Sequence, residues 1–329
     1  WHRWAERAAQ GLRADQRQEI EQELIALCPQ RYDRAYVMNQ HTRAIVAGAL
    51  LANSYIGPLT QGPLSEQLSP WAAYIRDIAR ARRANHIHLS DAFCGMCELV
   101  PTGIAPRCLA PQVPQTRTLE QIGQGGGPWV GLIVGAGDTV RLVPVDIWRT
   151  WIVRFLSVIP RGRVVLLGQE AERPRAQDIQ QTLPPSILGR IWDLTGQTTI
   201  HELAQTLSRC HHVIGSDTGP LHLAAAVGTP VLGWYFGRAR VHETGPYGSG
   251  HLIWQGNSGE GGLAEPAEWP IEPSLDVLLH DYPRPQRDWT QWHSHTDRWG
   301  TYYSEAGHTP APPREREAVW HALSPALPA

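Results

Sequence analysis

The segment Val213-Ile-Gly-Ser-Asp-Thr-Gly-Pro-Leu-His-Leu-Ala-Ala-Ala-Val-Gly-Thr-Pro-Val-Leu-Gly-Trp-Tyr-Phe236 decides the fold. It predicts a strand, a polar turn, a short helix of small residues and a second strand. Pro220 suits the first turn of a helix, because its missing N–H would have no intrahelical acceptor there. Gly228 suits the left-handed residue after a helix, and Pro230 prevents continuation. The expected elements are a strand at 213–215, a helix at 221–227 and a strand at 231–236.

The polar turn of this βαβ unit, Ser216–Gly219, lies at the carboxyl end of its first strand. Open α/β sheets bind ligands at that edge. The helix that follows presents unpaired backbone N–H groups and the positive end of its dipole to the turn. The segment therefore predicts a phosphate-binding loop.

Bulk composition limits the other function classes. The chain has 329 residues, which predicts two domains, and charged residues make up 18% with a net charge of −2. That balance gives no reason to expect a nucleic-acid partner. Every basic residue is Arg, so any cation that grips a phosphate must be a guanidinium. The five cysteines, an odd number, favour a reducing compartment, and we expect a cytoplasmic protein.

Other histidine and cysteine patterns favour structural roles. Cys94-Gly-Met-Cys97 has the spacing of a metal-ligand pair, but no second pair follows, and its apolar neighbours are typical of a buried helix face. A metal or redox function of this pair remains an alternative. The pairs His86/His88 and His293/His295 alternate as in a strand or loop.

The order of elements along the chain predicts two α/β layers. Residues 100–128 are rich in Pro, Gly and Gln and are interpreted as a linker. Beyond Gly256 we expect loop-like chain and a closing helix. The expected helices are at 1–30, 44–52, 71–84, 88–99, 148–158 and 314–323, and the expected strands are at 32–39, 54–57, 129–134 and 164–167. The expected domains are 1–124, 125–280 and a Trp/Pro-rich tail at 281–329.

The run Asp217-Thr-Gly-Pro-Leu-His-Leu-Ala224 resembles the signature of glycosyltransferase family 9, the heptosyltransferase family. The resemblance extends over about residues 20–255. The other matching pieces are Gly135-Ala-Gly137 with Arg141, Gly168–Glu172, Leu194-Thr-Gly196, Gly245-Pro-Tyr247, and the pattern Trp71, Tyr74, Arg83, Asn85, His88 and Asp91. Val134 and Val143 depart from the family pattern, which has Pro and Trp there.

The resemblance implies a GT-B fold, in which two Rossmann-like domains face a cleft, the second holding a nucleotide-diphosphate sugar. Arg141 would contact the donor phosphates, and Glu172, with Glu170 as the alternative, would contact the ribose. Asp217 would accept from sugar hydroxyls or cap the helix, and His222 would donate to a phosphate or sugar oxygen. The expected donor-binding set is Gly135, Ala136, Gly137, Arg141, Glu172, Asp217, Thr218, Gly219, Pro220 and His222.

The implied activity is inverting transfer of a sugar, heptose from ADP-heptose, to a lipopolysaccharide-type acceptor. No Asp-x-Asp motif is present, so we expect chemistry without a metal or other cofactor. No apolar run reaches the ~20 residues that a membrane span needs, so we expect at most peripheral contact at the inner face of the membrane. The alternatives are another GT-B enzyme, such as a UDP-sugar transferase or epimerase, and a catalytically silent nucleotide-sugar-binding protein.

One departure concerns catalysis. The family's catalytic base is an Asp in a Gly-Asp loop after the first strand of the acceptor domain. The sequence does not begin with a strand, a Gly-Asp loop and a helix, and residues 1–27 resemble the middle of that domain. We therefore expect the base upstream of Trp1, an incomplete first domain, and a chain that binds nucleotide without transferring sugar.

Overall fold

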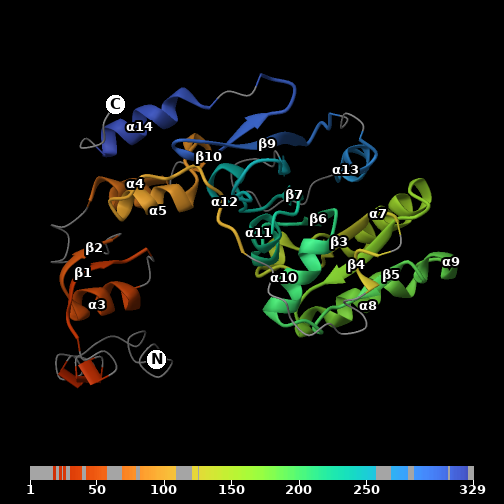
Figure 1. Cartoon of the computed structure of the whole chain (residues 1–329), viewed down its shortest axis with the longest axis horizontal. Helices are drawn as coiled ribbons and strands as arrows, with labels where there is room; N and C mark the ends of the chain where they lie inside the picture. Colours follow the sequence, from red (N-terminus) through yellow and green to blue (C-terminus); the bar gives the residue numbers. More distant parts are fainter. Residues whose placement is uncertain are drawn as a thin grey trace. The chain divides into compact units, whose positions relative to one another are not determined.

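The computed structural model shows a mixed α/β protein (Figure 1). By packing, the chain forms two compact units. Unit 1 comprises Trp1–Pro101 and Arg314–Ala329, and unit 2 comprises Thr102–Pro313. Composition predicts boundaries after residues 124 and 280, whereas packing places the ends of unit 2 at Thr102 and Pro313. The residues described are 18–19, 22–23, 25–26, 30–38, 42–57, 69–78, 82–108, 121–124, 126–256, 268–280, 285–309 and 312–324.

The described part of unit 1 contains a parallel strand pair with a connecting helix. Val37, Ile45 and Tyr55 form a small buried cluster there. Most of the helix expected at 1–30, Cys28 and the loop at 39–41 lie outside the described residues. The elements are β1 (Tyr32–Tyr36), α3 (Thr42–Leu51), β2 (Ala52–Ile56), α4 (Pro70–Ile78), η2 (Arg82–Ala84), α5 (Leu89–Met96) and α14 (Arg314–Leu323).

Helix α14 packs on α4 through two tryptophans. The rings of Trp71 and Trp320 have centroids 4.2 Å apart, and Trp71 Nε1 donates to Ser324 Oγ at 2.7 Å. Gly95 on α5 allows Trp71 to lie close, since a Cβ at 95 would stand 2.2 Å from the indole. The helix predicted at 314–323 is confirmed, and its Trp320 is buried against Trp71 of α4.

Unit 2 is built on an eight-stranded sheet in the order β10-β9-β8-β7-β6-β3-β4-β5 (Figure 1). The six strands from β8 to β5 are parallel, whereas β9 and β10 are antiparallel. The strands are β3 (Trp129–Ile133), β4 (Arg163–Leu167), β5 (Ile191–Asp193), β6 (His212–Gly215), β7 (Val231–Tyr235), β8 (Leu252–Gly256), β9 (Trp289–Asp297) and β10 (Gly300–Glu305).

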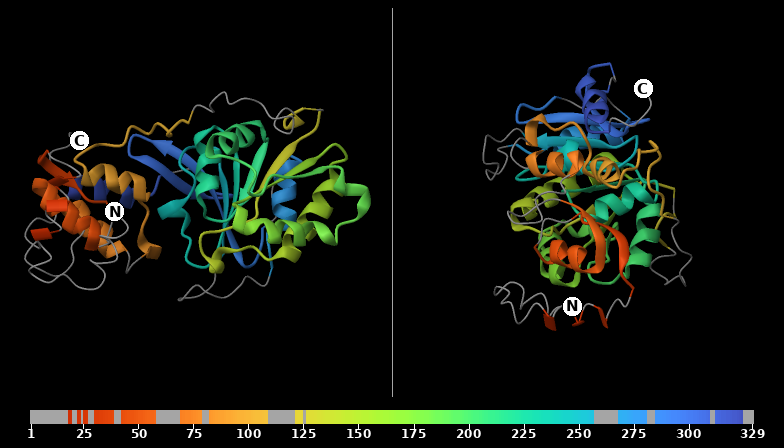
Figure 2. Two further views of the ribbon diagram at one scale, coloured as in Figure 1. Left: turned by 90° about the horizontal axis from the view of Figure 1, so that it is seen from below. Right: turned by 90° about the vertical axis from the view of Figure 1, so that its left-hand side faces the viewer.

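Helices cover both faces of this sheet (Figure 2). The core on one face takes residues from α7, α8 and α13, and the core on the other takes residues from α10, α11 and α12. The helical elements are η3 (Thr139–Arg141), α7 (Val145–Val158), η4 (Glu170–Glu172), α8 (Arg173–Gln181), α9 (Pro185–Leu188), α10 (Ile200–Arg209), α11 (Gly219–Ala226), α12 (Val241–Thr244) and α13 (Ile271–Leu278).

The expectation of loop-like chain from Gly256 to the closing helix is wrong. Helix α13 and strands β9 and β10 occupy much of that segment. Trp269 and Trp289 are buried in the same core as Trp234, so the segment belongs to the fold of unit 2. The sequence did not predict β9 because many of its residues are polar: Trp-Thr-Gln-Trp-His-Ser-His-Thr-Asp. An antiparallel strand can have this composition, since only one of its faces needs to be apolar.

The order of the parallel strands identifies where a ligand would bind. From β5 to β8 the order matches the doubly wound arrangement 3-2-1-4-5-6, with a switch in chain direction between the neighbours β3 and β6. Ligands bind outside the carboxyl ends of the strands at such a switch point. Among the described residues, no helix is both long and apolar enough to cross a membrane.

Candidate functional site

A cavity of about 990 Å³ lies at this switch point. All ten residues expected in the donor-binding set line it: Gly135, Ala136 and Gly137 with Arg141 after β3, Glu172 after β4, and Asp217, Thr218, Gly219, Pro220 and His222 after β6. The fold therefore brings three loops together that lie as much as 87 residues apart, from 135 to 222. Their assignment to a donor remains a prediction.

The loop after β6 takes the expected conformation. Helix α11 starts at Gly219 with Pro220 in its first turn, and Gly228 after the helix has φ +88°. Thr218 has extended backbone at the N-cap and makes no side-chain capping bond. The first turn of a helix has amides without intrahelical acceptors, and Gly219, the first residue of α11, lines the cavity. This end of α11 is suited to an anion.

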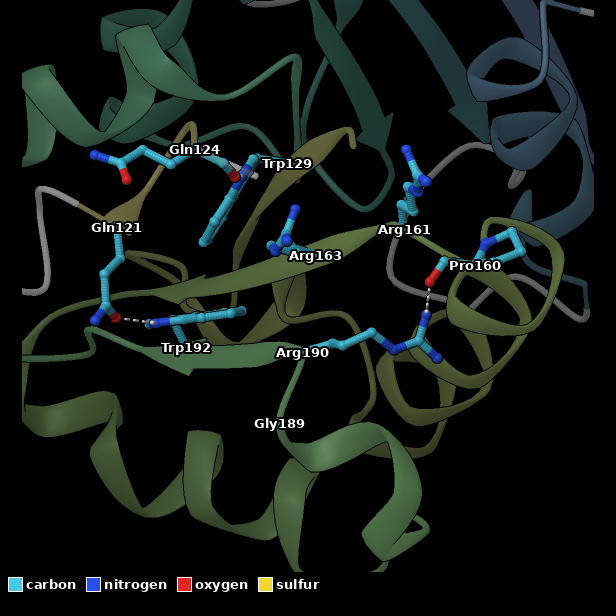
Figure 3. Close-up of a pocket in the computed structure, with 9 residues that line it drawn as sticks. All are labelled: Gln121, Gln124, Trp129, Pro160, Arg161, Arg163, Gly189, Arg190 and Trp192. Carbon is cyan, nitrogen blue, oxygen red and sulfur yellow. Dashed lines mark hydrogen bonds between the residues drawn. The ribbon is translucent and has the colours of Figure 1, made fainter. Parts of the chain in front are cut away.

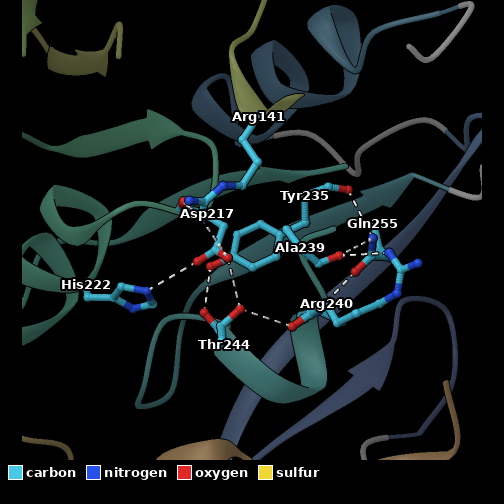
Figure 4. A network of polar contacts seen from close by, with 9 residues as sticks. Arg141, Asp217, His222, Tyr235, Ala239, Arg240, Thr244 and Gln255 are labelled. Carbon is cyan, nitrogen blue, oxygen red and sulfur yellow. Dashed lines mark hydrogen bonds and ion pairs between the residues drawn. The ribbon is translucent and has the colours of Figure 1, made fainter. Parts of the chain in front are cut away.

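Asp217 is held as the centre of a polar network rather than as a helix cap (Figure 4). Its Oδ2 accepts from Arg141 Nη1 at 3.3 Å and from Thr244 Oγ1 at 3.1 Å. Its Oδ1 lies 3.5 Å from His222 Nε2. The side chain of Asp217 is only 13% exposed, so these partners offset the desolvation of a carboxylate. The helix-capping alternative for Asp217 is therefore wrong.

Arg141 is fixed by the loop that it faces. Its Nη1 donates to the backbone oxygen of Asp217 at 2.7 Å as well as to the carboxylate. These bonds use one of the three guanidinium nitrogens, and the side chain is 26% exposed at the cavity. Asp138 caps the 3₁₀ turn η3 that carries Arg141, since its Oδ1 accepts from the Val140 amide. A guanidinium so placed can still present N–H donors to a phosphate.

Two residues that the sequence analysis missed support this network. Thr244, at the end of α12, bonds Asp217 directly. Tyr235 Oη donates to the backbone oxygen of Thr244 at 2.8 Å. Burial, and next the nearby Asp217 carboxylate, raise the pKa of Tyr235 well above its ordinary value, so its hydroxyl stays protonated. The available signal was that Thr244 directly precedes the family-like turn Gly245–Tyr247.

A third missed residue, Arg175, holds the loop after β3 at both ends. Its Nε donates to the backbone oxygen of Val134 at 2.8 Å, and its Nη2 donates to that of Val143. Burial lowers the pKa of Arg175. Because Gly135–Arg141 lies between these two carbonyls, Arg175 fixes the part of the loop that lines the cavity.

Glu172 closes the side of the cavity near β4. Its Oε2 accepts from the Gln169 amide at 2.7 Å. A Cβ at Gly135 would stand 1.7 Å from Glu172 Oε1, so this close approach requires glycine. The alternative residue, Glu170, pairs with Arg173 at 3.0 Å and is 68% exposed. Both acids line the cavity, and Glu172 is the one fixed in place.

Part of the remaining wall of the cavity is apolar. Residues from β3, β4, α10 and α11 contribute: Ile133, Leu167, Ile200, Leu203 and Leu223. A capping box opens α10: Thr199 Oγ1 accepts from the Glu202 amide and Glu202 Oε2 accepts from the Thr199 amide, at 3.3 and 2.8 Å. The second of these bonds lowers the pKa of Glu202. Apolar wall and charged loop together suit a ligand with a base at one end and phosphates at the other.

A family model described as glycosyltransferase family 9 (heptosyltransferase) matches residues 24–260. The chain belongs to glycosyltransferase family 9. A stretch of 72 residues is 32% identical to lipooligosaccharide heptosyltransferase 2 of Haemophilus influenzae. That stretch covers 22% of this chain and 21% of the relative, so the match spans about a fifth of that protein.

Two solved heptosyltransferases share the fold of this family 9 chain. The E. coli ADP-heptose LPS heptosyltransferase II superposes with a TM-score of 0.57 at 17% identity, covering 81% of this chain and 80% of that one. The E. coli heptosyltransferase WaaC with ADP gives 0.50 at 16% identity, covering 85% and 80%. The expected GT-B fold class is thereby confirmed.

The family-like pattern in unit 1 builds a rigid turn. Asn85 Oδ1 accepts from Tyr74 Oη at 2.5 Å and from the Ile87 amide at 3.0 Å. His88 Nδ1 accepts from the Ser90 amide at 3.2 Å and so caps α5. Asn85, His88 and Asp91 are buried. These contacts give the first part of the resemblance a structural role.

The cysteine pair lies on and just after α5. Cys94 and Cys97 are free thiols, and burial is the main cause that raises the pKa of each. No group of three or more His, Cys, Asp or Glu side chains among the described residues could hold a metal ion. A raised thiol pKa lowers the fraction of reactive thiolate at neutral pH.

Proposed function

We propose that this family 9 protein transfers heptose from ADP-heptose to a lipopolysaccharide-type acceptor. The observation that carries the proposal is the convergence of the ten expected donor-binding residues on one cavity at the switch point of the sheet. About 990 Å³ accommodates a nucleotide-diphosphate sugar. The family match and the bound ADP named for the E. coli WaaC structure support the donor class.

The proposed reaction requires positively charged or N–H donor groups around the diphosphate leaving group. When the anomeric C–O bond breaks, the diphosphate takes both bonding electrons and gains negative charge. The amides at Thr218 and Gly219, the dipole of α11 and the guanidinium of Arg141 would stabilise that charge, and all three residues line the cavity. The ion pair with Asp217 would hold the Arg141 guanidinium in place. A bound diphosphate would then accept hydrogen bonds from the guanidinium N–H groups that Asp217 does not use.

The rest of the donor fits the other walls. The adenine would lie on the apolar residues of α10 and the strand ends, near Leu203. Glu172 would accept from the ribose through Oε1, since Oε2 already accepts from Gln169. His222, 40% exposed and 3.5 Å from Asp217, would donate to a phosphate or sugar oxygen. We further propose transfer with inversion and without a metal, in the cytoplasm at the inner face of the membrane.

The first experiment measures nucleotide binding by isothermal titration calorimetry with ADP, UDP and AMP. We expect ADP to bind more tightly than AMP because the second phosphate meets Arg141, and more tightly than UDP. The variant Arg141→Gln should lose most of the difference between ADP and AMP. Arg154→Gln is the matched control, since Arg154 on α7 pairs with Glu272 on α13 and does not line the cavity.

The second experiment measures transfer of labelled heptose from ADP-heptose to a core oligosaccharide acceptor, with and without EDTA. Transfer that survives EDTA would support the full proposal. Tight ADP binding without transfer would agree with the expectation that this chain binds nucleotide but transfers no sugar, and transfer by this chain would overturn that expectation. A preference for UDP would reassign the donor, and no nucleotide binding at all would refute the assignment of the cavity.

A further inference from the structure

A second cavity, of about 530 Å³, lies in unit 2 at the opposite edge of the sheet (Figure 3). It lies at the amino ends of β3, β4 and β5, whereas the donor cavity lies at their carboxyl ends. The two cavities have no lining residue in common. Neither the family signature nor the proposed transfer reaction uses this second cavity.

The register of the strands builds an aromatic wall for it. Trp129 pairs with Arg163, and Trp192 pairs with Val165, two residues further along the same strand. Residues two apart on a strand point to the same face. Trp129 and Trp192 therefore meet, with ring centroids 4.6 Å apart and planes at 51°. Trp129 is buried, whereas Trp192 is only partly buried and lines the opening.

Among the residues that the structure describes, the charged wall consists of three arginines and no acid. The lining residues include Arg161, Arg163 and Arg190 but neither Asp nor Glu. Arg190 has a structural task, because it donates to the backbone oxygens of Leu156 and Pro160 at the end of α7. Arg163 lies over the Trp129 ring at 5.4 Å. Arg161 is exposed, and within the described chain it makes no hydrogen bond or ion pair.

Neutral polar groups complete the lining. Gln121 Oε1 accepts from Trp192 Nε1 at 3.3 Å, which leaves the amide NH₂ of Gln121 to donate elsewhere. The backbone oxygen of Gln124 accepts from Trp129 Nε1 at 2.9 Å. Both indole N–H groups are thus satisfied within the protein. A ligand would meet ring faces, guanidinium donors and amide donors.

We propose that this cavity binds an anionic saccharide, a sugar that carries a carboxylate or a phosphate. The apolar C–H face of a pyranose would stack on Trp192. Its acid group would bind Arg161 and Arg163, which can hold two oxygens in parallel. A hydroxyl would accept from Gln121.

The site is distinct from the donor site, so its test is made with the donor cavity filled. Saturation-transfer NMR titrations of the full chain in saturating ADP would use glucuronate, glucose 6-phosphate, glucose and inorganic phosphate. We expect glucuronate and glucose 6-phosphate to bind, glucose to bind much more weakly, and phosphate to bind at least tenfold more weakly than the sugar phosphate.

Three variants assign that binding to the cavity. Arg161→Gln and Arg163→Gln should each weaken binding of glucose 6-phosphate by about tenfold, the usual cost of one charge-assisted hydrogen bond. Trp192→Ala should remove the preference for glucose 6-phosphate over phosphate. Arg154→Gln, which removes one exposed guanidinium elsewhere in unit 2, should change nothing. The melting temperature of each variant shows whether it is folded.

Several results would overturn the proposal. If phosphate binds as tightly as glucose 6-phosphate, the cavity attracts an adventitious ion only. If neither acidic sugar binds in folded wild-type protein, the arginines are structural. Competition by ADP would place the sugar in the donor cavity. ADP binding is measured separately from sugar binding. Failure of this proposal therefore leaves the proposed transferase function unaffected, and failure of the transferase proposal leaves the anionic-saccharide site unaffected.

Discussion

Replacing Gly219 by Ala separates ligand binding from folding at the signature loop. A Cβ at this position would have no heavy atom within 4 Å, and the residue opens helix α11. Ala is favoured over Gly in helices by up to about 1 kcal/mol. We therefore expect the free energy of unfolding to stay unchanged or to rise by up to about 1 kcal/mol.

The same methyl group should weaken donor binding. Gly219 lines the proposed donor cavity, so a Cβ that meets no protein atom would occupy space where we expect a phosphate to approach the backbone. Loss of one hydrogen bond to a charged group costs about 1.5–3 kcal/mol. That cost corresponds to a dissociation constant for ADP that is about 10- to 150-fold higher. Stability and affinity should thus change in opposite directions.

Urea unfolding and calorimetric ADP titration of the same preparations test this. Gly189→Ala is the matched control, because a Cβ there also has no atom within 4 Å, φ is −66°, and the residue does not line the donor cavity. Gly135→Ala should behave differently and destabilise unit 2, since its Cβ would overlap the Glu172 carboxylate. Unchanged ADP affinity in stable Gly219→Ala protein would refute the placement of the diphosphate against α11.

Three further predictions address the network and its surroundings. Arg141→Gln should lower the free energy of unfolding by about 1–3 kcal/mol, because it leaves the poorly exposed Asp217 carboxylate without its guanidinium; an unchanged urea midpoint would contradict the pairing. Thr218→Val should leave the melting temperature unchanged or higher, because the Thr218 hydroxyl is buried and has no hydrogen-bond partner in the described chain; a marked fall would reveal a missing partner. Burial lowers the pKa of His251 to about 4 from an ordinary 6.5, so the unfolded chain takes up a proton before the folded one does as pH falls. As pH falls from 6.5 to 4, His251 should therefore lower the free energy of unfolding by up to about 3 kcal/mol. The unfolding free energy of His251→Gln should depend less on pH than that of wild type, and parallel curves would contradict this role of His251.

The parts of the fold that were predictable from the sequence carry strong local signals. The βαβ unit around α11 was marked by Pro220, Gly228 and Pro230, each of which fits one backbone conformation. The capping box at Thr199 and Glu202 likewise has a local signal, since Thr and Glu stand three residues apart at the start of α10. Strands β3 and β4 are continuous apolar runs, as expected of strands buried on both faces.

The parts that were not predictable depend on partners far away in the chain. Asp217 looked like a helix cap because the sequence shows only its neighbours, whereas the structure pairs it with Arg141 and Thr244, 76 and 27 residues away. Strand β9 has alternating polar residues and forms a strand because it pairs in antiparallel fashion with β8. Arg175 belongs to no recognisable sequence motif. Its role in fixing the loop after β3 is visible only from its hydrogen bonds to the backbone oxygens of Val134 and Val143.

The packing of Trp320 against Trp71 has a consequence for how the protein is made. Unit 2 lies within a continuous stretch of chain, and its residues leave the ribosome in one run. Unit 1 is closed by α14, which is synthesised 213 residues after Pro101 (314 minus 101). During translation at about 5–20 residues per second, the indole of Trp71 stays without its partner for roughly ten seconds or longer. Synthesis of unit 1 thus starts before that of unit 2 but is completed after it, and an apolar surface exposed in the meantime is where a chaperone would bind the nascent chain.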